Sequence, residues 1–497
     1  WGNIMKFTRS LFIIIIILFF SFLKKGYAIE NKLSRYELTV LKICEGVVQL
    51  FKQTPDAVWP GYNLAETPFI VYIPDKWVLL FNYKEKVEGF NSYPVNWPDL
   101  GCYVQFHKGK YKDLVGQLVF DFPIDTIKTI AIDFPKKYPG SFKQPEIILS
   151  GYIVHEAFHQ YQHNNFGEIP WKREEKYPIL DRENTSLVYL EMRLLMDALK
   201  SFKMNNRIEF ENCIKQFVAI RNYRWKKGFV KEYEQGQEIN EGTARYVELK
   251  FLELMKNLVY KSSLEGMISS LYDDFQSVSM PEYLLTDFEA RMTGNSISPE
   301  DMPRNRIYPV GSAQGFLLDY LGINWKPEAQ KAGNNFSFVN LFKRKLSIKE
   351  DCYEQLIRSA KEKYNYKDVL GHTDVLIKKY INGFKSELTS FEKQAGCRIE
   401  IEFGYKSISR SRSSNMKKWI IDRGTKSLCR KYNVYVLKNK SLFLELHNTG
   451  VFEQNDWDKK IKKVVFFSPE ITLCSLDNRI LKPKKNVEYQ FNRIELT

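Results

Sequence analysis

IILSGYIVHEAFH, residues 147–159, contains an H-E-x-x-H motif directly after an apolar run that is typical of a helix. Residues four apart on a helix share one face, so His155 and His159 can bind the same metal ion. Glu156 lies one position further round, where its carboxylate can act on water instead of binding the metal. The chain has only six His in 497 residues, so few such matches are expected by chance. The stretch therefore predicts a helix, beginning near Pro145 and Glu146, that carries half of a site for metal-assisted hydrolysis.

A catalytic zinc site normally takes three protein ligands and leaves one position for water, so a third ligand is needed. His163 continues the four-residue spacing, but it lies about 12 Å along the helix axis from His155, too far to share an ion. We expect it to be a partly exposed residue at the helix end or a substrate contact. Glu241 is a better candidate, because small residues at 242 and 244 would let its helix pack against the motif helix. A surface acid on an amphipathic helix is the alternative for Glu241.

The order of these two motifs resembles that of the gluzincin metallopeptidases, in which H-E-x-x-H is completed by a Glu on a later helix. The resemblance covers residues 145–325. It implies that His155, His159 and Glu241 bind Zn2+ and that Glu156 is the general base. Glu156 would accept a proton from a zinc-activated water and deliver it to the leaving amine.

Two further roles are expected around this site. Many gluzincins place an Asp four residues after the ligand Glu to orient a His, but here that position is Arg245. We expect Glu238 or Glu248 to supply the missing carboxylate. Related enzymes also stabilise the oxyanion with a Tyr or His from a later segment, and Tyr308 is the candidate because it precedes a Gly-containing helix start. An ordinary packing Tyr is an equally open interpretation.

The periodicity of the chain predicts an α+β fold in which a gluzincin-like metallopeptidase domain spans residues 29–389. Apolar, β-branched runs at 56–140, among them 69–73 and 77–81, predict a β-rich N-terminal lobe. Its strand at 129–133 is expected beside the substrate, and an interior strand with no free edge is the alternative. Residues 141–389 predict a helical C-terminal lobe. Beyond residue 390 the period changes to two, with a turn expected at 448–450. Residues 390–497 therefore predict an appended β-sandwich-like domain.

Residues 1–28 have the pattern of a secretory signal peptide. A basic n-region follows the expected start at Met5, residues 11–23 are apolar, and small residues lead to Ala28. The apolar stretch is short for a membrane span, although the two lysines that follow it leave an uncleaved anchor open. We expect cleavage near Ala28. The protein would then be secreted, at the cell surface or periplasmic, with membrane contact only if the segment stays uncleaved.

The net charge of +15 is unevenly distributed along the chain. Residues 1–28 carry +4 and residues 29–390 carry +1, whereas residues 391–497 carry 22 Lys and Arg against 12 Asp and Glu. A basic domain outside the cell suits an anionic surface polymer, and no specific nucleic-acid binding is predicted. A composition that serves solubility is the open alternative.

The seven Cys are widely spaced and include no C-x-x-C pair, which excludes a cysteine zinc knuckle. Cys397, Cys429 and Cys474 lie in the C-terminal part, where one disulfide is expected. The spacing does not decide which two would pair.

These features together predict an exported zinc-dependent metallopeptidase that hydrolyses a peptide or protein substrate. A zinc amidase acting on cell-wall peptides or other non-protein amides would use the same metal site. A non-catalytic extracellular binding protein on a peptidase scaffold is the third hypothesis, although the presence of Glu156 gives no sign of a lost active site. Metal analysis together with a Glu156→Gln variant would separate these hypotheses.

Overall fold

The computed structural model divides into two compact units, each made of three chain segments. Unit 1 comprises residues 1–169, 238–286 and 311–337, and unit 2 comprises residues 170–237, 287–310 and 338–497. The structure describes residues 35–92, 103–112, 114–135, 145–167, 174–226, 228–258, 273–395, 397–403, 410–415, 418–421, 424–438, 443–456, 460–468 and 493–496. The expected signal peptide lies outside these residues. Both units contain helices and sheet, so the predicted α+β class is confirmed.

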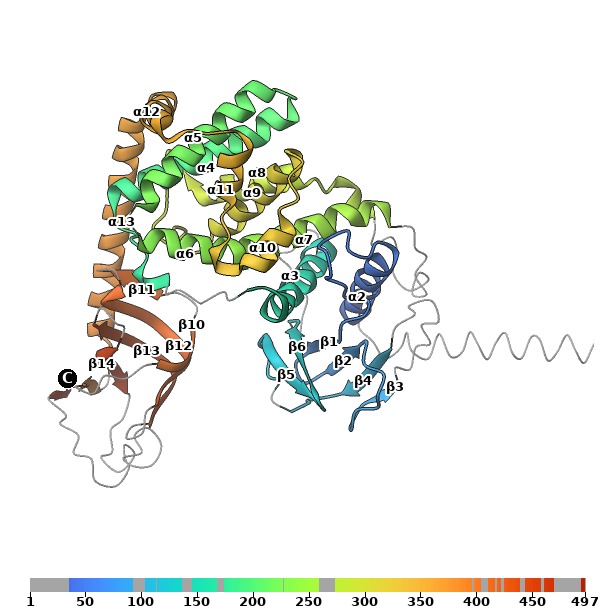
Figure 1. The fold of residues 1–497 in the computed structure, drawn as a ribbon. Coiled ribbons are helices and arrows are strands. Elements are labelled where there is room, and N and C mark those ends of the chain that lie inside the picture. Colours follow the sequence, from blue (N-terminus) through green and yellow to red (C-terminus); the bar gives the residue numbers. More distant parts are fainter. Residues whose placement is uncertain are drawn as a thin grey trace, which may run out of the picture. The chain divides into compact units, whose positions relative to one another are not determined.

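The core of unit 1 is a six-stranded sheet with the order β3-β4-β2-β1-β6-β5 (Figure 1). Its strands are β1 (Phe69–Ile73), β2 (Trp77–Phe81), β3 (Asn91–Ser92), β4 (Val104–Lys108), β5 (Val119–Ile124) and β6 (Ile127–Asp133). β1 pairs parallel with β6, and the other neighbours pair antiparallel. Every residue of β1 and β2 is buried, as their continuous apolar sequences predict for central strands.

β6 is an interior strand of this sheet. It pairs with β1 on one side and with β5 on the other. The expectation that the strand at 129–133 lies beside the substrate is therefore wrong, because neither of its edges is open to a further strand. β5 is the outermost strand on this side of the sheet.

Unit 1 also contains several helices. They include α2 (Arg35–Gln53), α3 (Pro145–Asn165), the π-helix η2 (Glu238–Gly242), α7 (Thr243–Leu254), η3 (Met255–Asn257), η4 (Asp273–Ser277), α10 (Lys326–Ala332) and η5 (Gly333–Asn335). Figure 1 shows α2 and α3 on the same side of the sheet, and α3 packs against α2, α7 and β6. α3 begins at Pro145 and Glu146, as predicted, because Pro needs no N–H in the first turn and an acid suits the positive helix end.

Two helices contribute residues to both units: α8 (Met280–Arg291) and α9 (Ile307–Tyr320). The helices of unit 2 are η1 (Glu174–Lys176), α4 (Arg182–Lys203), α5 (Arg207–Trp225), α6 (Phe229–Gln237), α11 (Phe338–Lys345), η6 (Glu350–Cys352), α12 (Tyr353–Lys363) and α13 (Tyr366–Glu392). α4 and α5 pack on each other, and β7 (Met292–Thr293) pairs with β8 (Ser296–Ile297). The helical pattern of this part of the chain is confirmed.

The C-terminal part of unit 2 is one antiparallel seven-stranded sheet with the order β10-β12-β13-β14-β9-β15, and β11 pairs with β12. Its strands are β9 (Cys397–Glu402), β10 (Arg410–Asn415), β11 (Lys418–Ile421), β12 (Lys426–Lys438), β13 (Phe443–Asn455), β14 (Ile461–Ser468) and β15 (Arg493–Leu496). Among the described residues all of these strands belong to one hydrogen-bonded sheet, so this part of the chain is β-rich as expected, and its sandwich-like arrangement stays a prediction. The strand pattern at 487–491 lies outside the described residues.

Both faces of this sheet are nevertheless buried. On β14, Val464 and Phe466 belong to a core cluster on one face. Val465, between them, packs with Phe384 and Phe391 of α13 on the other face. The helix α13 therefore covers one face of β14.

The turn expected at 448–450 does not form, because these residues lie inside β13. Asn448 has a φ of 53°, and β12 shifts register between Cys429 and Tyr432 opposite this stretch. A Cβ on Gly450 would lie 2.9 Å from the Arg430 carbonyl oxygen, so glycine allows the close approach of the two strands. The Asn and Gly that resemble a turn therefore mark a β-bulge.

One of the Cys expected to form a disulfide is resolved as a thiol. Cys429 Sγ donates a hydrogen bond to the Lys431 carbonyl, at 3.3 Å. The side chains of Cys397 and Cys474 lie outside the described residues.

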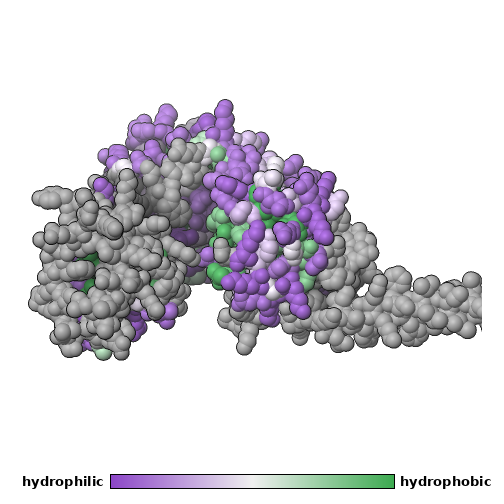
Figure 2. Space-filling view, turned by 90° about the horizontal axis from the view of Figure 1, so that it is seen from below, coloured by the Kyte–Doolittle hydropathy of each residue, from purple (hydrophilic) through white to green (hydrophobic). Residues whose placement is uncertain are grey.

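Figure 2 shows one face of the protein, on which the described surface is largely hydrophilic and the hydrophobic areas are small. In the part of the chain that the structure describes, no helix has both the length and the apolar content needed to cross a membrane.

Candidate metal centre

α3 and η2 bring the three predicted ligands of unit 1 together. One ligand atom from each of His155, His159 and Glu241 lies within 4.8 Å of the others, and no other such trio of His, Cys, Asp or Glu is found among the described residues. The Nε2 atoms of the two His are 3.2 Å apart. Glu241 Oε2 lies 3.6 Å from His155 Nε2 and 3.4 Å from His159 Nε2. His155 and Glu241 are buried, and His159 is half-buried.

The second ring nitrogen of each imidazole, Nδ1, has a hydrogen-bond partner of its own. His155 Nδ1 lies 3.1 Å from Glu248 Oε2, and His159 Nδ1 lies 2.8 Å from Gln162 Oε1. Both partners are acceptors, so each Nδ1 carries the proton and donates it. In the neutral imidazole, Nε2 then carries the lone pair.

Two Nε2 atoms and a carboxylate oxygen face one another at 3.2–3.6 Å. Such a group of electron-rich atoms is stable only when a positive charge, either a proton or a metal ion, is shared among them. Two neutral imidazoles and one carboxylate form the His2Glu donor set of catalytic zinc sites. The residues therefore fit a zinc ion.

The electrostatics of the site also favour a positive charge. Burial lowers the pKa of His155, but hydrogen bonds to Glu241 and Glu248 outweigh this effect and raise the pKa to about 9. Burial raises the pKa of the Glu241 carboxyl, whereas its hydrogen bonds to His155 and His159 hold that pKa far below the usual value. The carboxylates thus stabilise a cation at the imidazoles.

Glu156 is half-buried beside the ligands on α3. Burial raises the pKa of its carboxyl above the usual value, while the charges of His155 and His159 partly oppose this shift. A raised pKa makes a carboxylate a stronger proton acceptor, which suits a general base.

Glu248 on α7 is the carboxylate that contacts His155. It forms an ion pair with Arg245 one turn earlier on the same helix. Gly151 of α3 permits this approach, because a Cβ there would lie 3.0 Å from Glu248 Oε1. The alternative candidate, Glu238, instead accepts a hydrogen bond of 2.9 Å from Gln314 Nε2.

Glu241 lies in the π-helix η2, which the sequence did not predict. Single π-turns within helices occur frequently at functional sites. Gly242 lies in the same turn, and the helix that follows it packs against α3 as expected. A Cβ on Gly242 would lie 2.6 Å from Gly311 Cα of α9, so the close contact of this glycine is with α9.

β5 runs beside the metal group, and its outer edge has no strand partner among the described residues. The Phe120 and His159 rings are 6.3 Å apart between centroids, and Phe120 is 46% exposed. Gln160 Nε2 of α3 lies 3.4 Å from Asp121 Oδ1. A register shift against β6 marks a bulge in this stretch, where Asp121 has a φ of 53°. β5, instead of β6, therefore presents the strand edge nearest the ligands.

Two other predicted residues are not members of the ligand group. His163 is exposed in the last turn of α3, as expected for a residue at the helix end. Tyr308 was expected before a helix start, but α9 begins at Ile307, so Tyr308 lies in the first turn. Tyr308 belongs to unit 2 and the ligands belong to unit 1, and its role as an oxyanion donor stays a prediction.

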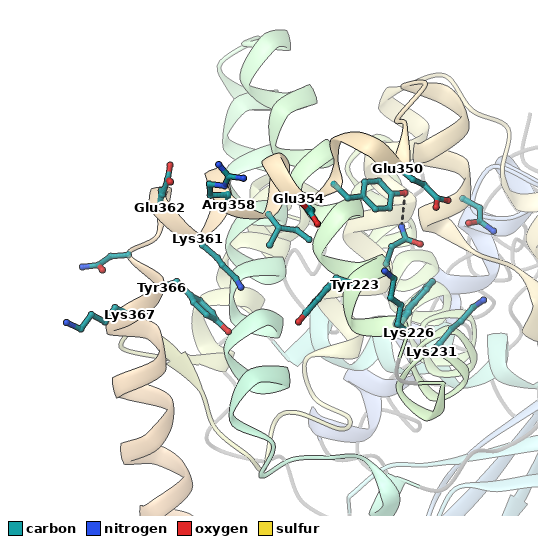
Figure 3. A pocket seen from close by; sticks show the side chains of 16 residues that line it. Tyr223, Lys226, Lys231, Glu350, Glu354, Arg358, Lys361, Glu362, Tyr366 and Lys367 are labelled. Atoms are coloured by element: carbon teal, nitrogen blue, oxygen red, sulfur yellow. Dashed lines mark hydrogen bonds between the residues drawn. The ribbon is translucent and has the colours of Figure 1, made fainter.

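A hollow of about 1020 Å³ lies on the helices of unit 2 (Figure 3). Its charged lining is Lys226, Lys231, Arg358, Lys361, Lys367, Glu350, Glu354 and Glu362. The sixteen lining residues include no His or Cys. We take the metal group as the candidate site because its donor atoms converge, whereas the hollow is a groove of mixed charge.

No family model, no curated protein and no solved structure matches the chain. The case for a function therefore rests on the residues and geometry of the site.

Proposed function

We propose that the chain is a zinc-dependent metallopeptidase of the gluzincin type. His155, His159 and Glu241 would hold the ion, and Glu156 would be the general base. The observation that carries the proposal is the convergence of two Nε2 atoms and one carboxylate oxygen, with both Nδ1 atoms already bound to acceptors. Such Nδ1 partners are a regular feature of metal-binding His, because they fix the tautomer and the ring orientation.

The arrangement of elements in unit 1 supports the gluzincin assignment. A β-sheet precedes the helix that carries H-E-x-x-H, and the third ligand comes from a later helical segment. α3 packs directly against α7, so the two halves of the ligand set are held by adjacent helices.

The residues of the site give the chemistry of peptide hydrolysis. A zinc ion in this site would supply a Lewis acid that polarises a carbonyl and lowers the pKa of water. Glu156 accepts a proton from the attacking water and delivers it to the leaving amine. The outer edge of β5 pairs with an extended peptide and directs it past the ligands.

The proposal extends to location and partners. The signal pattern of residues 1–28 would export the enzyme, and its substrate would be a peptide or protein. The basic residues beyond 390 would hold it near an anionic surface polymer.

The test compares the purified chain with Glu156→Gln by metal analysis and by hydrolysis of an internally quenched peptide. The variant should retain zinc and lose about 10²–10⁴-fold of the activity, the usual contribution of a general acid–base residue. His163→Gln is the matched control, since this exposed residue lies on the same helix, and it should retain both properties. Absence of zinc from the wild type, or full activity in Glu156→Gln, contradicts the proposal.

A further inference from the structure

Gln162 lies on α3, three residues after the ligand His159, and is 2% exposed. Its amide reaches two parts of the metal group at once. The oxygen accepts from His159 Nδ1 at 2.8 Å, while the nitrogen points to the segment that contains Glu241.

The amide nitrogen of Gln162 has three acceptors around η2. It lies 2.9 Å from the Ile239 carbonyl, 2.9 Å from the Asn240 carbonyl and 2.8 Å from Thr243 Oγ1. The Thr243 hydroxyl in turn donates to the Ile239 carbonyl at 2.5 Å. These contacts also fix the orientation of the amide, because only its nitrogen can donate to carbonyl oxygens.

The contacts matter because η2 is a π-helical turn within a longer helical stretch. A π-turn disturbs the regular ladder of backbone hydrogen bonds, and a buried carbonyl left without a donor is costly. Gln162 supplies a donor to the two carbonyls directly before Glu241. The same turn determines where the Glu241 carboxylate lies relative to the two imidazoles.

We propose that Gln162 is a positioning residue for the metal site. With one amide it holds His159 in the tautomer that presents Nε2, and it holds η2 in the π-turn that presents Glu241. This inference rests on the proposed function for the identity of the ion. It goes further in assigning both ligand orientations to a residue that binds no metal.

The chemistry of the side chain makes the assignment specific. In Gln162→Glu the acceptor for His159 remains, but a carboxylate oxygen would face the carbonyls of Ile239 and Asn240. In Gln162→Ala both contacts are lost. Thr243→Val removes one acceptor and the hydroxyl donor while nearly keeping the shape, so it is the mildest of the three changes.

The first measurement is zinc affinity, by competition with a chromophoric chelator at one pH. Gln162→Glu and Gln162→Ala should bind zinc about 10–100-fold more weakly, the usual effect of losing a partner of a metal ligand, and Thr243→Val should lose less. Gln160→Glu is the matched control, because Gln160 is also buried on α3 and contacts Asp121 of β5 instead of the ligand segment. It should bind zinc within about twofold of the wild type.

The second measurement is amide hydrogen exchange at residues 238–247 in the zinc-free protein. Exchange should be faster in both Gln162 variants than in the wild type and Gln160→Glu. Wild-type zinc affinity in both Gln162 variants overturns the inference whatever the exchange shows. Absence of zinc binding by the wild type overturns the proposed function instead. In that case, equal exchange rates in the wild type and the Gln162 variants would also overturn the role of Gln162 in holding η2.

Discussion

A buried charge cluster in unit 2 gives a direct test of how this fold is stabilised. Its members are Arg221, Arg224, Arg306, Glu191 and Glu234, each at most 2% exposed. Glu234 is the centre of the cluster. It accepts from Arg224 Nη2 at 2.6 Å and also from Arg306 Nη2. The variant to make is Glu234→Gln.

The size of the effect follows from the charges. Three guanidinium groups and two carboxylates leave the cluster at +1, and Glu234→Gln raises it to +2 with the arginines still buried. Glu234 also accepts from the Tyr177 hydroxyl at 2.7 Å and from Trp225 Nε1 at 2.6 Å. Removing one partner of a buried ion pair costs about 3–5 kcal/mol, and we expect this loss in the free energy of unfolding.

The pH dependence has a defined sign. Burial raises the pKa of Glu234, but Arg224, Arg306 and Arg221 outweigh it and hold the pKa far below the usual value. A carboxyl with a lowered folded-state pKa stabilises the protein fully above its unfolded-state pKa of about 4.3. This stabilisation is lost as the pH falls through the folded-state pKa. The difference between wild type and Glu234→Gln should therefore be constant above about pH 5 and shrink in more acidic solution.

The assay is urea denaturation followed by tryptophan fluorescence at pH 7 and at a series of acidic pH values. With a slope of about 1–3 kcal/mol per molar urea, a loss of about 3–5 kcal/mol should lower the midpoint by about 1–5 M. Glu350→Gln is the control, because Glu350 pairs with Lys343 on the surface and its loss should change little. A Glu234→Gln midpoint equal to that of the control at pH 7 refutes the reasoning.

Two further predictions concern the metal site. Glu248→Gln should weaken zinc binding about 10–100-fold in the chelator competition, because His155 loses its anionic partner, whereas Glu253→Gln on the same helix should not. Equal affinities in the two variants would count against the role of Glu248. Gly242→Ala should lower the unfolding free energy by about 1–3 kcal/mol in thermal denaturation, because its Cβ would meet the Gly311 backbone. Gly371→Ala, with open space around its Cβ, should not be destabilised, and equal losses in the two alanine variants would contradict the packing argument.

The sequence predicts well those features that local residues determine. β1 and β2 form at the predicted residues, because each is a short continuous apolar run. α3 begins at the predicted Pro145, and the spacing of its two His places both imidazoles on one face. The structure also brings Glu241 to these two His.

The missed features depend on pairing between distant segments. The order β1-β6-β5 places β6 inside the sheet, and no local pattern distinguishes an interior strand from an edge strand here. β14 contains a continuous apolar run at 464–467 and is buried on both faces, yet this run does not show that α13 covers one of them. No motif in the sequence singles out Gln162. Its contact with His159 could have been predicted, because residues three apart on a helix are neighbours and Gln162 follows His159 by three.

Arg245 stands where many gluzincins have an Asp, and the structure explains how the site works without that Asp. The family pattern expects a carboxylate four residues after the ligand Glu, whereas here the His155 partner is Glu248, seven residues after Glu241. Seven residues are close to two helical turns, so Glu248 lies on nearly the same face as Glu241 and also points to α3. Arg245 pairs with Glu248 and, together with His155, holds the pKa of that carboxyl below the usual value despite burial. An arginine at this position therefore supports the carboxylate one turn later, and the site keeps an anionic partner for His155 without an Asp at residue 245.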